Sequence, residues 1–176
     1  NLHFLLEALR PVTDGNVILK IVGPHEDEAY WAECQTVIDL LPKNIQVQVL
    51  GGVPYAQVLE HLKASHFFVL PTINENFGYV FIEAMAAGCP IVISDRTIWN
   101  DIEGYGAGVA IKLDNNEDWT LQFRKCLAMD QEEFRRMSVA AREYAIEWLR
   151  TPSIQDSVAR VLSVASNYLK HKQKRT

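Results

Sequence analysis

The chain has 176 residues, of which 48% are hydrophobic and 22% are charged, and its formal net charge is -5 at pH 7. These values are typical of one globular domain with a buried core, and they exclude a disordered chain and a protein built to coat nucleic acid. No apolar run approaches the roughly 20 residues of a membrane-spanning helix, and the three cysteines and five histidines are too scattered for a zinc site or a disulfide framework, so we expect reduced thiols in a cytoplasmic protein.

Apolar patterns predict helices and strands that alternate along most of the chain. The expected helices are 2–9, 26–42, 55–65, about 77–87, 117–128, 131–149 and 153–169, and the expected strands are 16–24, 45–52, 66–72, 91–94 and 106–113. This order predicts right-handed βαβ units, and therefore an α/β fold with a Rossmann-like parallel sheet and helices on both faces. Because the chain opens on a helix, we expect the sheet to lack its first strand, and the chain to be a fragment of a larger protein.

In a sheet of this kind, ligands bind at the carboxyl ends of the strands. Three loops are expected there, at 23–24, 51–54 and 72–77. The third loop contains Glu75 and leads into the helix near 77–87. The first N–H groups of that helix have no intrahelical partner, and with the helix dipole they form an anion site. Gly78 would let the backbone approach a bulky ligand closely.

Glu83 lies inside the same helix, where nearly all other residues are apolar. A lone buried carboxylate is costly unless something donates a hydrogen bond to it. Its side chain leans back toward the helix N-terminus, and therefore toward the crevice next to Glu75. A carboxylate that accepts from two adjacent hydroxyls suits a ribose diol. The crevice would then offer hydrogen-bond acceptors for the hydroxyls of a ribose and of a second sugar, and N–H donors for phosphates. A ribose, a sugar and phosphates are the parts of a nucleotide-sugar.

The segment PTINENFGYVFIEAMAAGCPIVIS, residues 71–94, resembles the E-x7-E motif of group 1 (family 4) retaining glycosyltransferases with the GT-B fold. The flanking segments LKIVGP, VLGGVPYAQVLEHLKASHFFVLPT and SDRTIWNDIEGYGAG resemble the same family, so the likeness covers nearly the whole chain. The matched motif positions are Pro71, Glu75, Phe77, Gly78, Glu83, Ala84, Met85, Ala86, Gly88 and Pro90. The resemblance implies the C-terminal, donor-binding half of such an enzyme, without its acceptor-binding N-terminal domain.

The resemblance also implies roles for individual residues. Glu75 would contact hydroxyls of the donor sugar and be the catalytic residue, and Glu83 would bind the ribose. Val53 would contact the base, and Tyr55 is a second candidate for that contact. The backbone of a short segment would hold the sugar and the diphosphate; its residues are Asn76, Phe77, Gly78, Tyr79 and Val80. No metal or other cofactor is expected.

The chain departs from the family pattern in three ways. Asn76 stands where glycine is most common, and His66 stands where the family often has Asp. The arginine and lysine that neutralise the donor diphosphate in this family lie before the first helix and are not in this chain. We therefore expect the chain alone to bind a donor but to be inactive or nearly inactive.

The implied function is transfer of a sugar, as by a hexosyltransferase, from a nucleotide diphosphate sugar to a hydroxyl acceptor with retention. Polysaccharide biosynthesis is one setting, and lipid and small-molecule acceptors stay open. Two alternatives also stay open: a nucleotide-sugar epimerase of the same fold, and a non-catalytic nucleotide-binding or assembly module. No nucleic-acid partner is expected.

Other polar features have structural interpretations. Asp101 and Glu103 are interpreted as part of a short capped helix around a buried Trp99, and His66 as structural. We expect a nucleotide-sugar-binding domain at 1–169 and a basic tail at 170–176. The tail is interpreted as a solvated end, with a weak contact to an anionic membrane surface as the alternative.

Overall fold

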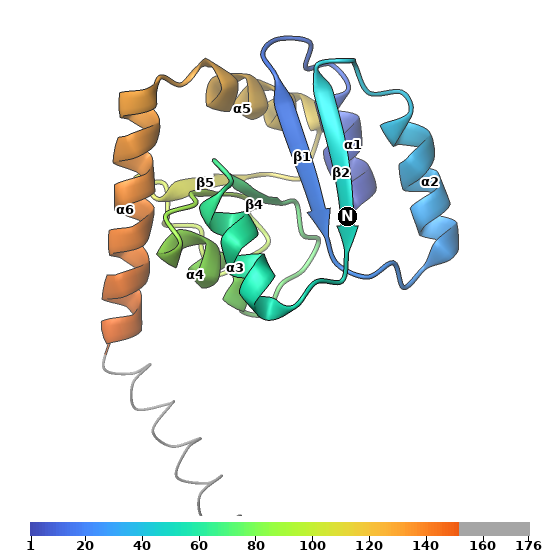
Figure 1. Cartoon of the computed structure of the whole chain (residues 1–176). Helices are drawn as coiled ribbons and strands as arrows, with labels where there is room; N and C mark the ends of the chain where they lie inside the picture. Colours follow the sequence, from blue (N-terminus) through green and yellow to red (C-terminus); the bar gives the residue numbers. More distant parts are fainter. Residues whose placement is uncertain (152–176) are drawn as a thin grey trace, which may run out of the picture.

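A computed structural model of the protein describes residues 1–151 (Figure 1). The expected helix 153–169 and the basic tail 170–176 lie outside these residues. The described elements are, in chain order, α1 (Leu2–Leu9), β1 (Val17–Val22), α2 (Glu28–Ile38), β2 (Ile45–Gly51), α3 (Tyr55–Lys63), β3 (Phe68–Leu70), α4 (Tyr79–Ala86), β4 (Ile91–Ser94), β5 (Gly108–Ile111), α5 (Asn116–Ala128) and α6 (Gln131–Arg150).

All strand pairs are parallel, as the βαβ pattern predicts, and they form two groups. β1 pairs with β2, and β4 lies between β3 and β5. Among the described residues no strand pairing joins β1 to β3. This interruption is the position at which a doubly wound order places its first strand, the strand that the sequence analysis expects to be missing.

Helices cover both faces of the sheet, and β4 shows how the two layers are built. Val92 packs in one core cluster with residues of α1 and α5, while Ile91 and Ile93 pack in a second cluster with residues of α4 and α6. Because successive side chains of a strand point to opposite faces, a strand between two helical layers must be apolar on both. All four residues of β4 are buried, so the expectation of a strand covered on both faces is confirmed.

Two expected helices differ from the structure. α2 ends at Ile38 rather than near residue 42, because the chain tightens there: the Leu41 N–H donates to the Ile38 carbonyl, three residues back. The short helix expected after Trp99 is wrong. Residues 100–106 form consecutive turns that end at Gly106, whose φ of 69° is left-handed and stops a helix. The prediction that Trp99 is buried is confirmed, since it is 1% exposed.

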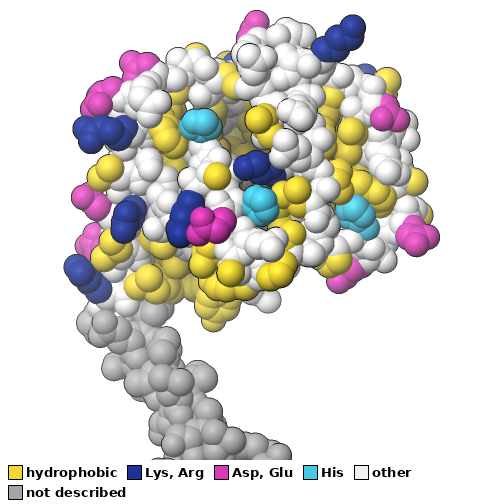
Figure 2. Space-filling model, in the orientation of Figure 1, with side chains coloured by type: hydrophobic (Ala, Val, Ile, Leu, Met, Phe, Trp, Pro, Cys, Tyr) yellow, Lys and Arg dark blue, Asp and Glu magenta, His cyan; other side chains and the backbone are white. Residues whose placement is uncertain are grey.

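The surface shows no single basic face in the view of Figure 2. Lys and Arg side chains are interspersed with Asp and Glu side chains over the part of this face that the structure describes. Within residues 1–151, no helix combines the length and the apolar character that a membrane span requires.

Candidate functional site

Side chains from other parts of the chain fix the loop between β3 and α4. The buried hydroxyl of Ser94, at the end of β4, donates to the Thr72 carbonyl, and the Trp99 indole N–H donates to the Phe77 carbonyl. The Thr72 hydroxyl in turn donates to the Asn74 carbonyl at 2.9 Å. A backbone segment held at several carbonyls is preorganised for a ligand. The sequence analysis did not anticipate these supports, because no periodicity marks a residue that acts through a distant carbonyl.

Gly78 makes the turn from this loop into α4. Its φ of 73° and ψ of 65° are left-handed, a conformation that other residues adopt only at a cost. A Cβ atom at this position would overlap the Phe81 ring and would lie 3.1 Å from Cγ of Glu75. Only glycine therefore fits here, for reasons of both conformation and space, and Glu75 lies directly against the turn.

The N-terminus of α4 has no side-chain cap and no acidic residue in its first turn. The Phe81 N–H donates to the Gly78 carbonyl at 2.9 Å, while the N–H groups of Tyr79 and Val80 have no backbone acceptor among the described residues. Uncapped N–H groups at a helix start attract anions such as phosphate. The helix whose start the sequence predicts to be an anion site begins at Tyr79, one residue after the left-handed glycine.

Glu83 is half-buried, and its Oε1 accepts a hydrogen bond from the Tyr55 hydroxyl at 3.1 Å. The expectation of a partnerless carboxylate inside the core is therefore wrong. α4 has an outer side, on which Tyr79 and Ala86 are exposed and Glu83 faces α3. The sequence does not reveal this outer side, because the other residues on it are apolar or small.

The other expected site residues lie around the same edge. Glu75 is half-buried and Asn76 is exposed, both in the loop after β3. Val53 is half-buried and follows the end of β2, two residues before α3 begins. The hydrogen bond from Tyr55 to Glu83 connects the element after β2 with the element after β3. The carboxyl-end loops that the sequence analysis singled out at 51–54 and 72–77 thus precede two helices that touch.

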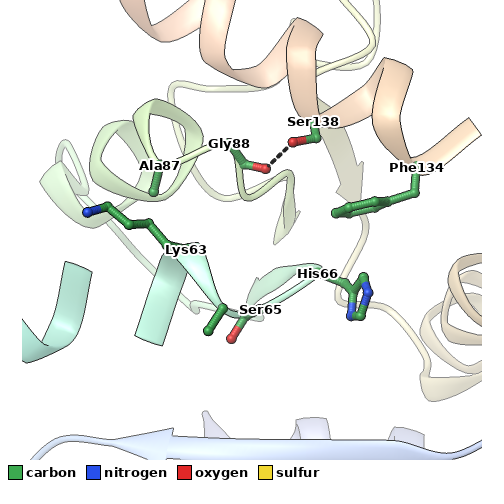
Figure 3. Close-up of a pocket in the computed structure, with 8 residues that line it drawn as sticks. Lys63, Ser65, His66, Ala87, Gly88, Phe134 and Ser138 are labelled. Atoms are coloured by element: carbon green, nitrogen blue, oxygen red, sulfur yellow. Dashed lines mark hydrogen bonds between the residues drawn. The ribbon is translucent and has the colours of Figure 1, made fainter. Parts of the chain in front are cut away.

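A cavity of about 230 Å³ lies at the opposite end of the strands (Figure 3). It is lined by the chain leading into β3, the chain leading into β4, and α6. His66 is exposed there, with its ring 4.9 Å from the Phe134 ring, and the Ser138 hydroxyl donates to the Gly88 carbonyl at 2.6 Å. This cavity shares no residue with the loop around Glu75. Within residues 1–151, no group of three or more His, Cys, Asp or Glu side chains is placed to hold a metal ion.

Comparison with known proteins agrees with this arrangement. The family described as glycosyl transferases group 1 matches residues 1–144. The chain belongs to this family. The O-antigen chain mannosyltransferase RfbU of Salmonella typhimurium is 27% identical over 119 residues, which are 68% of this chain and 33% of that protein. The phosphatidyl-myo-inositol mannosyltransferase of Mycobacterium leprae is 33% identical over 94 residues, 52% of this chain and 24% of that protein.

Solved structures show the same fold. A crystal structure of Anabaena HepE in complex with UDP-glucose has a TM-score of 0.76 at 22% identity and covers 92% of this chain and 44% of that one. WaaG, a glycosyltransferase involved in lipopolysaccharide biosynthesis, has a TM-score of 0.64 at 17% identity, with 92% and 50% covered. The resemblance to the C-terminal domain of a group 1 GT-B glycosyltransferase is therefore confirmed. The chain spans a third or less of these curated relatives and about half of these structures.

Proposed function

We propose that this chain binds the nucleotide diphosphate sugar of a glycosyltransferase that moves the sugar to a hydroxyl acceptor. The observation that carries the proposal is the uncapped start of α4, set by a left-handed Gly78 and flanked by the carboxylates of Glu75 and Glu83. An anion site between two carboxylates that can each accept hydrogen bonds from hydroxyls matches a diphosphate that lies between a sugar and a ribose. The family membership of the chain and the UDP-glucose named for HepE support this proposal.

Each group has a separate task in this proposal. The N–H groups of Tyr79 and Val80 donate to the diphosphate, and Glu75 accepts from hydroxyls of the transferred sugar. Glu83 accepts from the ribose hydroxyls, one helical turn beyond Tyr79. Val53, after β2, contacts the base.

The reaction would proceed by electrostatic stabilisation of the departing diphosphate, with retention at the sugar carbon and without a metal ion. Negative charge grows on the leaving diphosphate as the sugar bond breaks, and N–H donors aimed at that charge lower the barrier. The N-terminus of α4 supplies such donors from this chain. Basic residues of the larger protein would supply the rest. Retention and metal independence rest here on the family resemblance.

A further part of the proposal is that the active enzyme includes an acceptor-binding domain beyond these 176 residues. The partial coverage of the curated relatives and of the solved structures supports it. The chain alone should then bind donor nucleotides and transfer little or no sugar. Turnover by the 176-residue chain at the rate of a complete enzyme, in an assay with a panel of nucleotide sugars and acceptors, would contradict this part.

The test of the site compares two substitutions, Glu83→Ala and Glu75→Ala. Removal of the Glu83 carboxylate should weaken nucleoside diphosphate binding by about 1.5–3 kcal/mol, the range for a hydrogen bond to a charged group. Glu75→Ala should leave the affinity for the bare nucleoside diphosphate nearly unchanged. In the complete enzyme, Glu75→Ala should lower turnover by about thirtyfold, which corresponds to a loss of about 2 kcal/mol of transition-state stabilisation.

Affinity is measured by titration calorimetry and turnover by sugar transfer, with thermal melting as the check on folding. If Glu83→Ala collapsed the melting temperature and left affinity unchanged, Glu83 would be a structural residue. Identical behaviour of the two variants in both assays would contradict the separation of sugar and ribose. Nucleotide binding without transfer by the complete protein would favour the non-catalytic module, and interconversion of nucleotide sugars would favour the epimerase.

A further inference from the structure

The contact between Tyr55 and Glu83 joins two helices at the mouth of the site. Tyr55 is the first residue of α3, directly after Pro54, and Glu83 lies in the second turn of α4. The phenol donates and the carboxylate accepts, at 3.1 Å. Both partners therefore sit on regular helices rather than on free loops, and a hydrogen bond between them limits the rotamers that Glu83 can adopt.

Packing does not explain why Tyr55 occupies this place. Its side chain is 60% exposed, and it belongs to none of the core clusters. α3 is already attached to the core by Leu62, with Val58 and Leu59 packed against the same cluster. An exposed hydrogen bond adds little to the stability of two helices that are already anchored.

The geometry leaves most of the carboxylate free for a ligand. An ionised carboxylate has about four acceptor positions on its two oxygens. Tyr55 occupies one position on Oε1, so Oε2 and the rest of Oε1 remain able to accept from two neighbouring hydroxyls. The phenol itself stays protonated at neutral pH, because its hydrogen bond to Glu83 raises the pKa of Tyr55 further.

From this contact we propose that Tyr55 is a positioning residue, whose hydroxyl holds the Glu83 carboxylate in the orientation that accepts from both ribose hydroxyls of the donor nucleotide. This inference rests on the proposed function and extends it to the recognition of ribose over deoxyribose. It differs from a contact of the Tyr55 ring with the base, because it depends on the hydroxyl rather than on the ring.

The test uses Tyr55→Phe, which removes the hydroxyl and keeps the ring. Uridine, guanosine and adenosine diphosphates are titrated into the 176-residue chain, and the tightest of them is compared with its 2′-deoxy counterpart. We expect the wild type to prefer the ribonucleotide. Tyr55→Phe should weaken ribonucleotide binding by about two- to tenfold, because the Glu83 side chain would then have to be ordered when the nucleotide binds. Its affinity for the deoxynucleotide, which keeps only the 3′-hydroxyl as a partner for Glu83, should fall by a smaller factor.

Tyr105→Phe is the matched control, because Tyr105 is similarly exposed at 56% and lies in the turns before β5. It should change neither affinity. In a Glu83→Ala background, Tyr55→Phe should have no further effect on ribonucleotide affinity, since the carboxylate that it orients is gone. The melting temperature of Tyr55→Phe should stay close to that of the wild type.

The outcomes separate this inference from the proposed function. If the wild type binds a nucleoside diphosphate and Tyr55→Phe weakens the ribonucleotide and the deoxynucleotide equally, or neither, the positioning role is overturned and the proposed function stands. If Tyr55→Phe acts equally in the wild-type and Glu83→Ala backgrounds, the role is also overturned. A folded wild-type chain that binds none of the three nucleotides would overturn both.

Discussion

Two helices of this protein, α4 and α6, begin in opposite ways. α6 starts with a complete capping box: the Asp130 carboxylate accepts from the Glu133 N–H at 2.8 Å, and the Glu133 carboxylate accepts from the Asp130 N–H at 3.0 Å. α4 starts at Gly78 with no side-chain cap. At the start of α6, side chains accept from the N–H groups of Asp130 and Glu133, whereas no side chain of the described residues accepts from an N–H group at the start of α4, which lies at the carboxyl edge of the sheet.

We expect this difference between the two helix starts to separate stability from ligand binding. A capping box satisfies donors that water or a ligand would otherwise satisfy, and it stabilises the helix without help from the rest of the fold. α4 has no such local support, so its position depends on buried residues on its inner side, on the Gly78 turn, and on side chains that reach its loop from β4 and beyond. We infer that damage at the start of α4 affects ligand binding, and that damage at the start of α6 does not.

The largest effect is expected for Gly78→Ala. The left-handed backbone and the overlap of a new Cβ with the Phe81 ring should together destabilise the fold by about 2–5 kcal/mol. Urea unfolding measures the loss. Gly52→Ala is the control, because Gly52 has an ordinary φ and nothing lies within 4 Å of the position that its Cβ would take, so this variant should unfold like the wild type. Equal stability of the two variants would show that the turn at Gly78 is not required.

A pair of tryptophans gives the sharpest comparison. Trp99 and Trp119 are both fully buried, and each indole N–H donates to a backbone carbonyl, that of Phe77 and that of Lys112 respectively. Replacement of either by Phe should cost about 2–4 kcal/mol, from a smaller ring and an unsatisfied carbonyl. Only Trp99→Phe should also weaken nucleoside diphosphate binding, because only Phe77 belongs to the loop before α4. Equal affinities in the two variants would contradict the supporting role of Trp99.

The far end of α4 is closed by Cys89, a fully buried thiol. Burial raises its pKa to about 12. The folded protein therefore holds this proton more tightly than the unfolded chain, so the contribution of the thiol to stability is complete below about pH 9 and is lost as the pH rises toward 12. The loss approaches about 1.4 kcal/mol per pH unit in that window. The difference in unfolding free energy between the wild type and Cys89→Ala should shrink with each step above pH 9, and parallel curves would contradict the burial of the thiol.

The smallest effect is expected for Asp130→Ala at the start of α6. Loss of the cap should cost about 1 kcal/mol of stability. Nucleoside diphosphate affinity should be unchanged at temperatures where the variant is folded, as measured by titration calorimetry. A clear loss of affinity would mean that the two helix starts are not separate in function.

Most of the fold follows from local patterns. The apolar pattern predicts each described helix and strand, because burial of one face or of both leaves a period in the sequence. It fails after Trp99, where a short helix is expected and residues 100–106 form turns. Element ends are less well predicted: α2 stops at Ile38 because of a tight last turn that no apolar period reveals. The motif around Glu75, Gly78 and Glu83 predicts the candidate site only through its resemblance to a family, and the structure adds that Gly78 has a left-handed φ.

The sequence by itself determined the α/β class, the parallel strands, the family and the helix whose uncapped start we propose as the diphosphate site. These depend on the order and period of residues close together in the chain. Only the tertiary structure decided which distant groups meet: Tyr55 with Glu83, Ser94 with Thr72, and Trp99 with Phe77. Such contacts depend on the angles at which helices and strands pack, and a hydrogen bond between residues more than 20 positions apart leaves no local pattern to read.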